Sequence, residues 1–337
     1  MQVTWSDTPP SLPQQLPCPM QQHPAYGQAC AQLGATPLWA RIHRGGECLA
    51  FAQLLSQRVG GICGGALMGR GPFLTHVMSP AEQAEIRQAL WQSLPVTGLK
   101  FMIDGAEHPH DTPGFLQIMS PQSRAILPIC PDAQSQEQRM HPKYRAALKK
   151  GLAGPLKLTQ ERFCDKQHRW LLAAEQMQRQ ERRYRNLPTG FPTAWAKAAP
   201  GSAHVFAAYL RGLPIAGILV LRHGASASYL LGWSGPLGRL HHAHAVLIWQ
   251  ATTWLRNAAG QSLDLGAIDT ESTAATGLSR FKLRGGAEAV QLGGTYLRGP
   301  ATRLFWKLAA RQSQTEPSHT NRGQTNRAEG LGLAVNR

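Results

Sequence analysis

The sequence has few acidic residues. It is 337 residues long and carries 19 Asp and Glu against 35 Lys and Arg, a formal net charge of +16. Charged residues make up 16% of the chain, below the usual share of about 25%, so the positive balance comes mainly from a shortage of acids. This balance favours polyanionic partners such as RNA, phosphorylated small molecules or anionic lipid headgroups.

Several other patterns are missing. The 6 cysteines include no C-x-x-C pair, which argues against zinc ribbons and redox dithiols, and we expect buried thiols in a reducing cytoplasm. The apolar run 213–221 is far shorter than the roughly 20 residues that span a bilayer. No cation precedes an apolar stretch at the N-terminus, so we expect no secretory signal and a cytoplasmic location. No G-x-S-x-G motif is present, so we expect no nucleophilic serine of that type.

The predicted elements follow one order in both halves of the chain. For the first half we expect a helix at 23–33, a hairpin of strands 37–43 and 48–57, a helix at 79–94 and a strand at 99–103 that ends at Asp104. For the second half we expect a helix at 164–184, strands at 204–210, 214–222 and 226–233, a helix at 241–257, a strand at 262–268, a short helix at 278–283 and a last strand at 289–296. The repeated order predicts a duplicated α/β unit with mixed sheets.

Positive charge is concentrated in one region. Residues 139–185 hold 13 Lys and Arg and 4 acids, so their net charge is 13 − 4 = +9. Lys143 and Arg145 lie with Lys149 and Lys150 on one short predicted helix, where like charges repel unless an anion lies against them. The alternative interpretation is an ordinary solvated face.

Two segments of the second half are candidate anion sites. The glycine-containing loop 234–239 precedes a helix whose N-terminus would attract phosphate, and Arg239 lies on it, although a plain connection has the same pattern. Arg280, Lys282 and Arg284 precede a glycine pair, which is typical of a helix C-cap and also suits an anion clamp at a cleft edge.

Histidines offer a weaker hypothesis of a metal site. His241, His242 and His244 lack a nearby carboxylate or thiolate, so polar residues at a helix N-terminus are the favoured interpretation. Residues 108–111 are similarly interpreted as a surface turn. We expect no metal.

Short motifs in both halves carry a family resemblance. Residues 244–250, the triplet 264–266 and residues 277–286 around Phe281 and Lys282 resemble the C-terminal domain of FemABX peptidyltransferases and related GNAT-fold acetyltransferases, including the BioF2-like acetyltransferase domain. Residues 140–151 are similar to the basic helix that joins the two domains of that family, and residues 70–72 resemble a loop of its first domain. The likeness extends over about residues 20 to 300.

The resemblance implies two tandem GNAT-like domains. The expected parts are a loose lead-in (1–20), a first domain (21–138), a basic linker helix (139–155), a second domain with the donor site (156–310) and a disordered tail (311–337). By the resemblance, Lys282 matches the lysine at the reacting carbonyl or its phosphate neighbour, and Lys143 and Arg145 match the linker helix. Asp104 matches an acidic residue that would position or deprotonate the acceptor amine.

The function expected from these observations is N-acyl transfer. A neutral amine attacks an activated ester or thioester directly, so the enzyme mainly aligns the partners and stabilises the oxyanion. We expect Lys282 as electrostatic stabiliser, Asp104 as base, and phosphate contacts from Lys143, Arg145, Arg239, Arg280 and Arg284.

The partners remain open at this stage. The donor would be acyl-CoA or aminoacyl-tRNA, used as a co-substrate without any tightly bound cofactor. The acceptor would be an amine-bearing small molecule or a peptidoglycan precursor; contact with tRNA or with a membrane surface stays open, and no DNA partner is expected. The alternatives are a non-catalytic RNA-binding protein using the basic face 139–185, whose binding would weaken steeply with salt, and a metal hydrolase.

Overall fold

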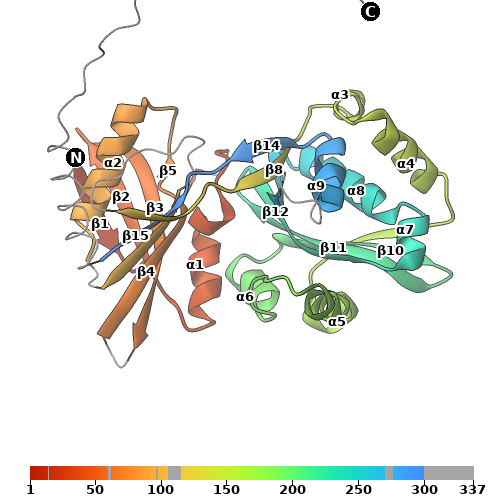
Figure 1. Cartoon of the computed structure of the whole chain (residues 1–337), viewed down its shortest axis with the longest axis horizontal. Coiled ribbons are helices and arrows are strands. Elements are labelled where there is room, and N and C mark those ends of the chain that lie inside the picture. The colour runs from red at the N-terminus through yellow and green to blue at the C-terminus, as the bar shows by residue number, and fades with distance from the viewer. Residues whose placement is uncertain (14, 60–61, 96–97, 105–114, 270–275, 300–337) are drawn as a thin grey trace, which may run out of the picture.

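The computed structural model describes residues 1–299 except 14, 60–61, 96–97, 105–114 and 270–275. Two mixed sheets form two halves of the molecule, with helices α1 and α6 lying between them (Figure 1). This arrangement confirms the predicted fold class, α/β with mixed sheets. No helix of the described residues is long and apolar enough to cross a membrane.

The first sheet has the strand order β1-β2-β3-β4-β6-β15-β7, with β5 beside β3. Its strands are β1 (Gln2–Ser6), β2 (Thr36–Arg44), β3 (Glu47–Val59), β4 (Ile62–Gly71), β5 (Phe73–Leu74), β6 (Leu99–Asp104), β7 (Leu116–Met119) and β15 (Thr295–Arg298). The associated helices are a 3-10 turn (Met20–Gln22), α1 (Pro24–Ala31) and α2 (Pro80–Gln92). Ser79 caps α2 and forms a capping box with Glu82, as expected from Ser-Pro at a helix start.

The second sheet has the order β14-β8-β13-β12-β11-β10-β9. Its strands are β8 (Ser123–Pro128), β9 (Lys157–Arg162), β10 (Ala203–Leu210), β11 (Leu213–His223), β12 (Ser226–Ser234), β13 (Ser262–Ile268) and β14 (Glu288–Gln291). The helices of this half are α3 (Ala133–Gln138), α4 (Pro142–Leu152), α5 (Asp165–Arg182), α6 (Phe191–Ala198), α7 (Pro236–Leu240), α8 (Ala243–Asn257) and α9 (Thr276–Arg284).

The two halves contain the same unit. In the first, β2, β3 and β4 are antiparallel neighbours, α2 follows, and β6 returns parallel to β4. In the second, β10, β11 and β12 are antiparallel, α8 follows, and β13 returns parallel to β12. The repeated element order in the sequence therefore corresponds to a repeated topology.

The halves also exchange strands, which the sequence analysis did not expect. β8 comes from the expected first domain but pairs with β13 and β14 in the second sheet, while β15 pairs with β6 and β7 in the first. The single last strand expected at 289–296 is consequently two strands, β14 and β15. Gly293 and Gly294 separate them, so the chain can cross from one sheet to the other.

The N-terminal segment also differs from expectation. Residues 1–20 were expected as a loose lead-in, but β1 pairs along its whole length with β2, because its backbone completes the free edge of the first sheet. The tail expected at 311–337 lies outside the described residues.

The central strand β11 is buried on both faces. Ile218 and Val220 pack with α8 on one face, whereas Leu219 and Leu221 pack with α5 and α6 on the other. This double burial explains the continuous apolar run at 213–221. It also places α5 and α8 on opposite faces of the second sheet.

Candidate active site

Parallel strands β12 and β13 separate after a short paired stretch. They pair only from Ser226 with Ser262 to Ser228 with Asp264. The equivalent strands of the first half, β4 and β6, pair from Gly65 with Leu99 to Gly71 with Asp104, the last residue of β6. In the described chain, the second sheet therefore opens at its middle, and side chains bond to backbone carbonyl oxygens along the opening, as Gln178 does to Gly232 and Lys282 to Ala267.

A cavity of about 950 Å³ occupies this opening. Residues of α4, α5, α7, α8 and α9 surround it, together with the separated ends of β12 and β13. Its cationic lining residues are Lys143, Arg182, Arg185, Arg239, Arg280, Lys282 and Arg284. Such a lining suits a substrate that carries several negative charges.

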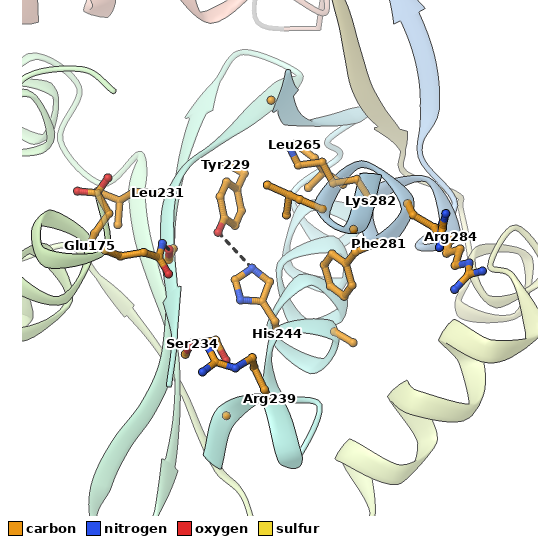
Figure 2. A pocket seen from close by; sticks show the side chains of 18 of the residues that line it. Glu175, Tyr229, Leu231, Ser234, Arg239, His244, Leu265, Phe281, Lys282 and Arg284 are labelled. Atoms are coloured by element: carbon orange, nitrogen blue, oxygen red, sulfur yellow. Dashed lines mark hydrogen bonds between the residues drawn. The ribbon is translucent and has the colours of Figure 1, made fainter. Parts of the chain in front are cut away.

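The fold brings most of the predicted site residues to this cavity. Lys143, Arg239, Arg280, Lys282 and Arg284 all line it, although they come from three different helices. Figure 2 shows Lys282 and Arg284 on α9 and Arg239 at the opposite end of the drawn pocket.

Two predicted residues are placed differently. The Arg145 guanidinium donates to the carbonyl oxygen of Glu137 at 3.2 Å and joins α4 to α3; Arg145 is not among the residues that line the cavity. Asp104 ends β6 with its backbone opposite Gly71, and its side chain is not described. The base role of Asp104 stays a prediction.

Lys282 lies beside β13 at the point where this strand has separated from β12. Its Nζ donates to the carbonyl oxygen of Ala267 on β13 at 2.8 Å. Burial, reinforced by Arg124, lowers the pKa of Lys282 to about 8, while Asp264 acts in the opposite direction. The lysine is therefore mainly protonated at neutral pH and can stabilise negative charge on a substrate.

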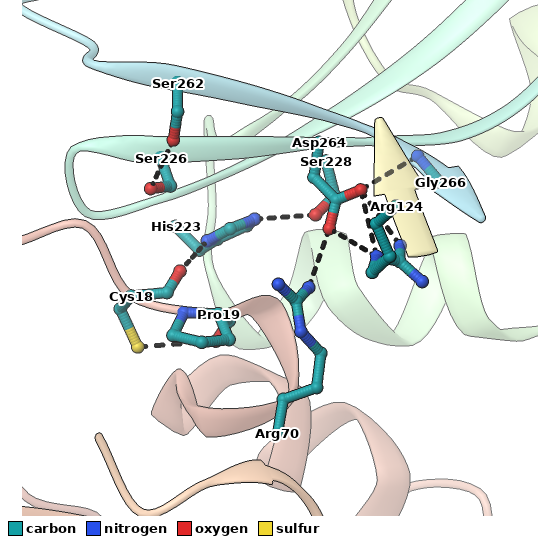
Figure 3. A network of polar contacts seen from close by, with 10 residues as sticks. All are labelled: Cys18, Pro19, Arg70, Arg124, His223, Ser226, Ser228, Ser262, Asp264 and Gly266. Carbon is teal, nitrogen blue, oxygen red and sulfur yellow. Dashed lines mark hydrogen bonds and ion pairs between the residues drawn. The ribbon is translucent and has the colours of Figure 1, made fainter. Parts of the chain in front are cut away.

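Asp264 organises a polar network beneath this lysine (Figure 3). Arg124 donates to both of its carboxylate oxygens, and Arg70 of the first half donates to Oδ2 at 2.7 Å. Asp264 Oδ1 also accepts from the backbone N–H of Gly266 at 2.8 Å, where Gly266 has a φ of +88°. The two guanidinium groups hold the pKa of Asp264 below its usual value despite burial. The network thereby fixes the bend of β13 that presents Ala267 to Lys282.

The linker helix α4 is docked against α9. The Tyr144 ring lies 5.2 Å from that of Phe281, and the backbone N–H of His141 donates to the carbonyl oxygen of Arg284 at 2.9 Å. Gly286, at a φ of +95°, ends α9 in the left-handed conformation that favours glycine. The glycine pair thus has the expected C-cap role, and the docking brings Lys143 to the cavity.

The structure also shows site residues that the sequence analysis did not single out for a role. His244 Nε2 and Tyr229 Oη are hydrogen-bonded at 3.1 Å inside the cavity (Figure 2). Burial and the charge of Lys282 lower the pKa of His244 to about 4, so this imidazole is neutral. On the α5 side, the buried Glu175 lines the cavity and accepts hydrogen bonds from Tyr184 and Asn186. His244 begins the motif 244–250, whereas no local motif marks Tyr229 or Glu175.

The glycine loop 234–239 is explained by packing. A Cβ on Gly238 would meet the carbonyl oxygen of Ile215 and the hydroxyl of Ser234. The helix that this loop opens, α7, is a short segment of 5 residues. Arg239 is held against the loop by its bond to the carbonyl oxygen of Ser234 at 2.7 Å. Among the described residues, His, Cys, Asp and Glu form no group suited to hold a metal ion.

Comparisons with known proteins support this description. Residues 138–288 match the model of the family described as acetyltransferase (GNAT) domain. No curated protein matches the sequence significantly.

Among solved structures, that of FemX has a TM-score of 0.66 at 14% sequence identity, covering 86% of this chain and 96% of FemX. The C-terminal domain of a putative lysylphosphatidylglycerol synthetase from Agrobacterium fabrum has a TM-score of 0.49 at 12% identity, with 87% and 93% covered. A tandem GNAT protein from the clavulanic acid biosynthesis pathway has a TM-score of 0.45 at 11% identity, with 83% and 87% covered. The expected resemblance is confirmed: residues 138–288 match a GNAT acetyltransferase domain, the fold is similar to that of FemX, and these matches support an acyltransferase.

Proposed function

We propose that the chain is an N-acyltransferase that moves an acyl or aminoacyl group from an activated donor to an amine in the cavity between β12 and β13. The observation that carries this proposal is the separation of these two strands beside Lys282. The opening between the strands gives room for an extended donor, whereas in the first half β6 is paired with β4 along its whole length. The second half is therefore the catalytic one.

The reaction needs alignment and charge stabilisation more than a nucleophilic side chain. The amine nitrogen attacks the acyl carbonyl carbon, a C–N bond forms, and the C–S or C–O bond to the donor breaks. The departing thiolate or alkoxide takes up a proton, and the amine loses one. Lys282, protonated and fixed on Ala267, stabilises the developing oxyanion. Asp104 is the proposed acceptor of the amine proton.

The cations around the cavity support a phosphate-bearing donor. Lys143, Arg239, Arg280 and Arg284 would contact the phosphates of acyl-CoA or of aminoacyl-tRNA. The match to an acetyltransferase domain is consistent with acyl-CoA as the donor. The similarity to the fold of FemX is the reason to keep aminoacyl-tRNA as the second candidate donor. The proposed acceptor is an amine-bearing small molecule or a peptidoglycan precursor.

The first experiment identifies the donor. Acetyl-CoA and a mixture of charged tRNAs are each added to the protein, and the melting temperature is measured, since a ligand of the native state stabilises it. We expect one of the two to raise the melting temperature, and the Arg280→Ala, Arg284→Ala double variant to reduce that rise. Stabilisation by neither donor would contradict the proposal.

The second experiment tests the role of Lys282. With the donor identified, transfer to a panel of primary amines is followed for the Lys282→Ala variant. Loss of one oxyanion-stabilising group typically costs about a hundredfold to a thousandfold in rate. The exposed Lys166→Ala change on α5 is the matched control. Full turnover by Lys282→Ala would exclude the proposed role.

A further inference from the structure

Glu175 is a buried carboxylate in a cavity otherwise lined by cations. It projects from α5, is 4% exposed and lines the cavity. Among the described residues that line the cavity, it is the only acidic one. Its Oε1 accepts from the hydroxyl of Tyr184 at 3.1 Å and from the side-chain amide of Asn186 at 3.2 Å.

Nothing in the described part of the chain neutralises this carboxylate directly. No Lys, Arg or His there forms an ion pair with Glu175, and both of its hydrogen bonds go to Oε1. Burial of an unpaired charge is costly, because the protein interior replaces water poorly. A glutamine would accept the same two bonds without that cost. Anchoring the loop at 184–186 therefore does not explain why the residue is an acid.

The position of Glu175 relates it to the opening in the sheet. α5 packs on the face of β11 that carries Leu219, whereas α8 packs on the opposite face with Ile218. In Figure 2, β12 passes between Glu175 on one side and His244 and Lys282 on the other. Glu175 and Lys282 line the same cavity. A substrate between β12 and β13 can therefore contact the Glu175 carboxylate on one face of the second sheet and the Lys282 ammonium on the other.

On this basis we propose that Glu175 is the binding group for a primary ammonium of the substrate, held by its free Oε2 while Tyr184 and Asn186 fix Oε1. The inference rests on the proposed function and deepens it, since it assigns the cationic end of the substrate to the α5 face. The ammonium could belong to the acceptor amine or to the amino acid of an aminoacyl donor. Both sources present the same chemistry to Glu175.

Pairs of matched probes, one with an ammonium group and one without it, show whether the ammonium bound by Glu175 belongs to the donor or to the acceptor. For the donor, the pairs are β-alanyl-CoA with propionyl-CoA, and the L-alanyl with the propionyl amide of 3′-amino-3′-deoxyadenosine. For the acceptor, the pair is 1-pentylamine with 1-pentanol. Binding of each probe to the full chain is measured by calorimetry for the wild type and for Glu175→Gln.

We expect the wild type to prefer the ammonium member of one pair by about tenfold or more, because hydrogen bonds to charged groups are the stronger ones. Glu175→Gln keeps the acceptor for Tyr184 and Asn186 and should abolish the preference. The exposed Glu181→Gln, on the same helix, should retain it.

The outcomes separate this inference from the proposed function. An ammonium preference in a donor pair assigns the group to the donor, and one in the amine pair assigns it to the acceptor. If no pair shows a preference that Glu175→Gln removes, the inference is overturned, even when propionyl-CoA or the propionyl amide still binds. If neither carrier binds but the amine preference disappears in Glu175→Gln, the inference holds and the proposed donors are wrong.

Discussion

The guanidinium of Arg70 donates across the junction of the two halves to the carboxylate of Asp264, at 2.7 Å. Arg70 is the penultimate residue of β4, a central strand of the first sheet, and has a φ of +55°, which is uncommon for a residue with a side chain. Asp264 is the last residue of β13 that pairs with β12. The contact therefore ties the first half to the point where the second sheet opens.

Loss of the Asp264 carboxylate should destabilise the fold strongly. In Asp264→Asn, two largely buried guanidinium groups lose their counter-charge, and breaking a buried ion pair in this way costs about 3–5 kcal/mol. Urea unfolding measures the free energy. The control is Arg44→Ala, which removes an exposed pair with Glu85 and should cost no more than about 1 kcal/mol. Equal costs for both variants would contradict the buried network.

The same network should set the pH dependence of transfer. If protonated Lys282 stabilises the oxyanion, the rate falls as pH rises through its pKa of about 8. Arg124 lowers that pKa and Asp264 raises it. The alkaline limb should therefore move to higher pH in Arg124→Met and to lower pH in Asp264→Asn. Rate profiles at saturating donor test this, and shifts of the same sign in both variants would refute it.

Buried histidine should make the fold sensitive to mild acid. The pKa of His244 is lowered from 6.5 to about 4, so the unfolded chain binds the proton first as pH falls. Between pH 6.5 and 4, this histidine removes about 1.4 kcal/mol of unfolding free energy per pH unit. In His244→Gln the pH slope should decrease by that amount. The exposed His76→Gln is the control, and an unchanged slope in His244→Gln would show that His244 titrates normally.

One hydroxyl in the linker helix should be dispensable. Among the described residues, no partner is found for the buried Oη of Tyr144, which packs on Phe281. Tyr144→Phe should stabilise the chain by about 1 kcal/mol, because a desolvated hydroxyl without a partner is unfavourable. Tyr229→Phe, which removes a hydroxyl bonded to His244, should instead destabilise by a similar amount. Thermal unfolding compares the two, and destabilisation by Tyr144→Phe would reveal a partner.

Local sequence signals determined much of the fold. Ser79 and Pro80 predict the start of α2, and Gly286 marks the end of α9, because caps and left-handed positions depend on neighbouring residues alone. The repeated order of elements predicted two equivalent units. Lys282 was singled out by its family resemblance, and the cations beside it by their place before a glycine pair.

Tertiary structure alone decided the rest. The exchange of β8 and β15 depends on sheet edges that are far apart in the sequence. The opening between β12 and β13 depends on where their pairing stops, and residues 226–234 read as one continuous strand. Glu175 is one of four acids in the basic region 139–185, and its proposed binding role depends on its burial in the cavity. The sequence thus specified which charges this protein carries, whereas long-range packing decided which of them meet, because electrostatic and hydrogen-bond energies depend on distance in space.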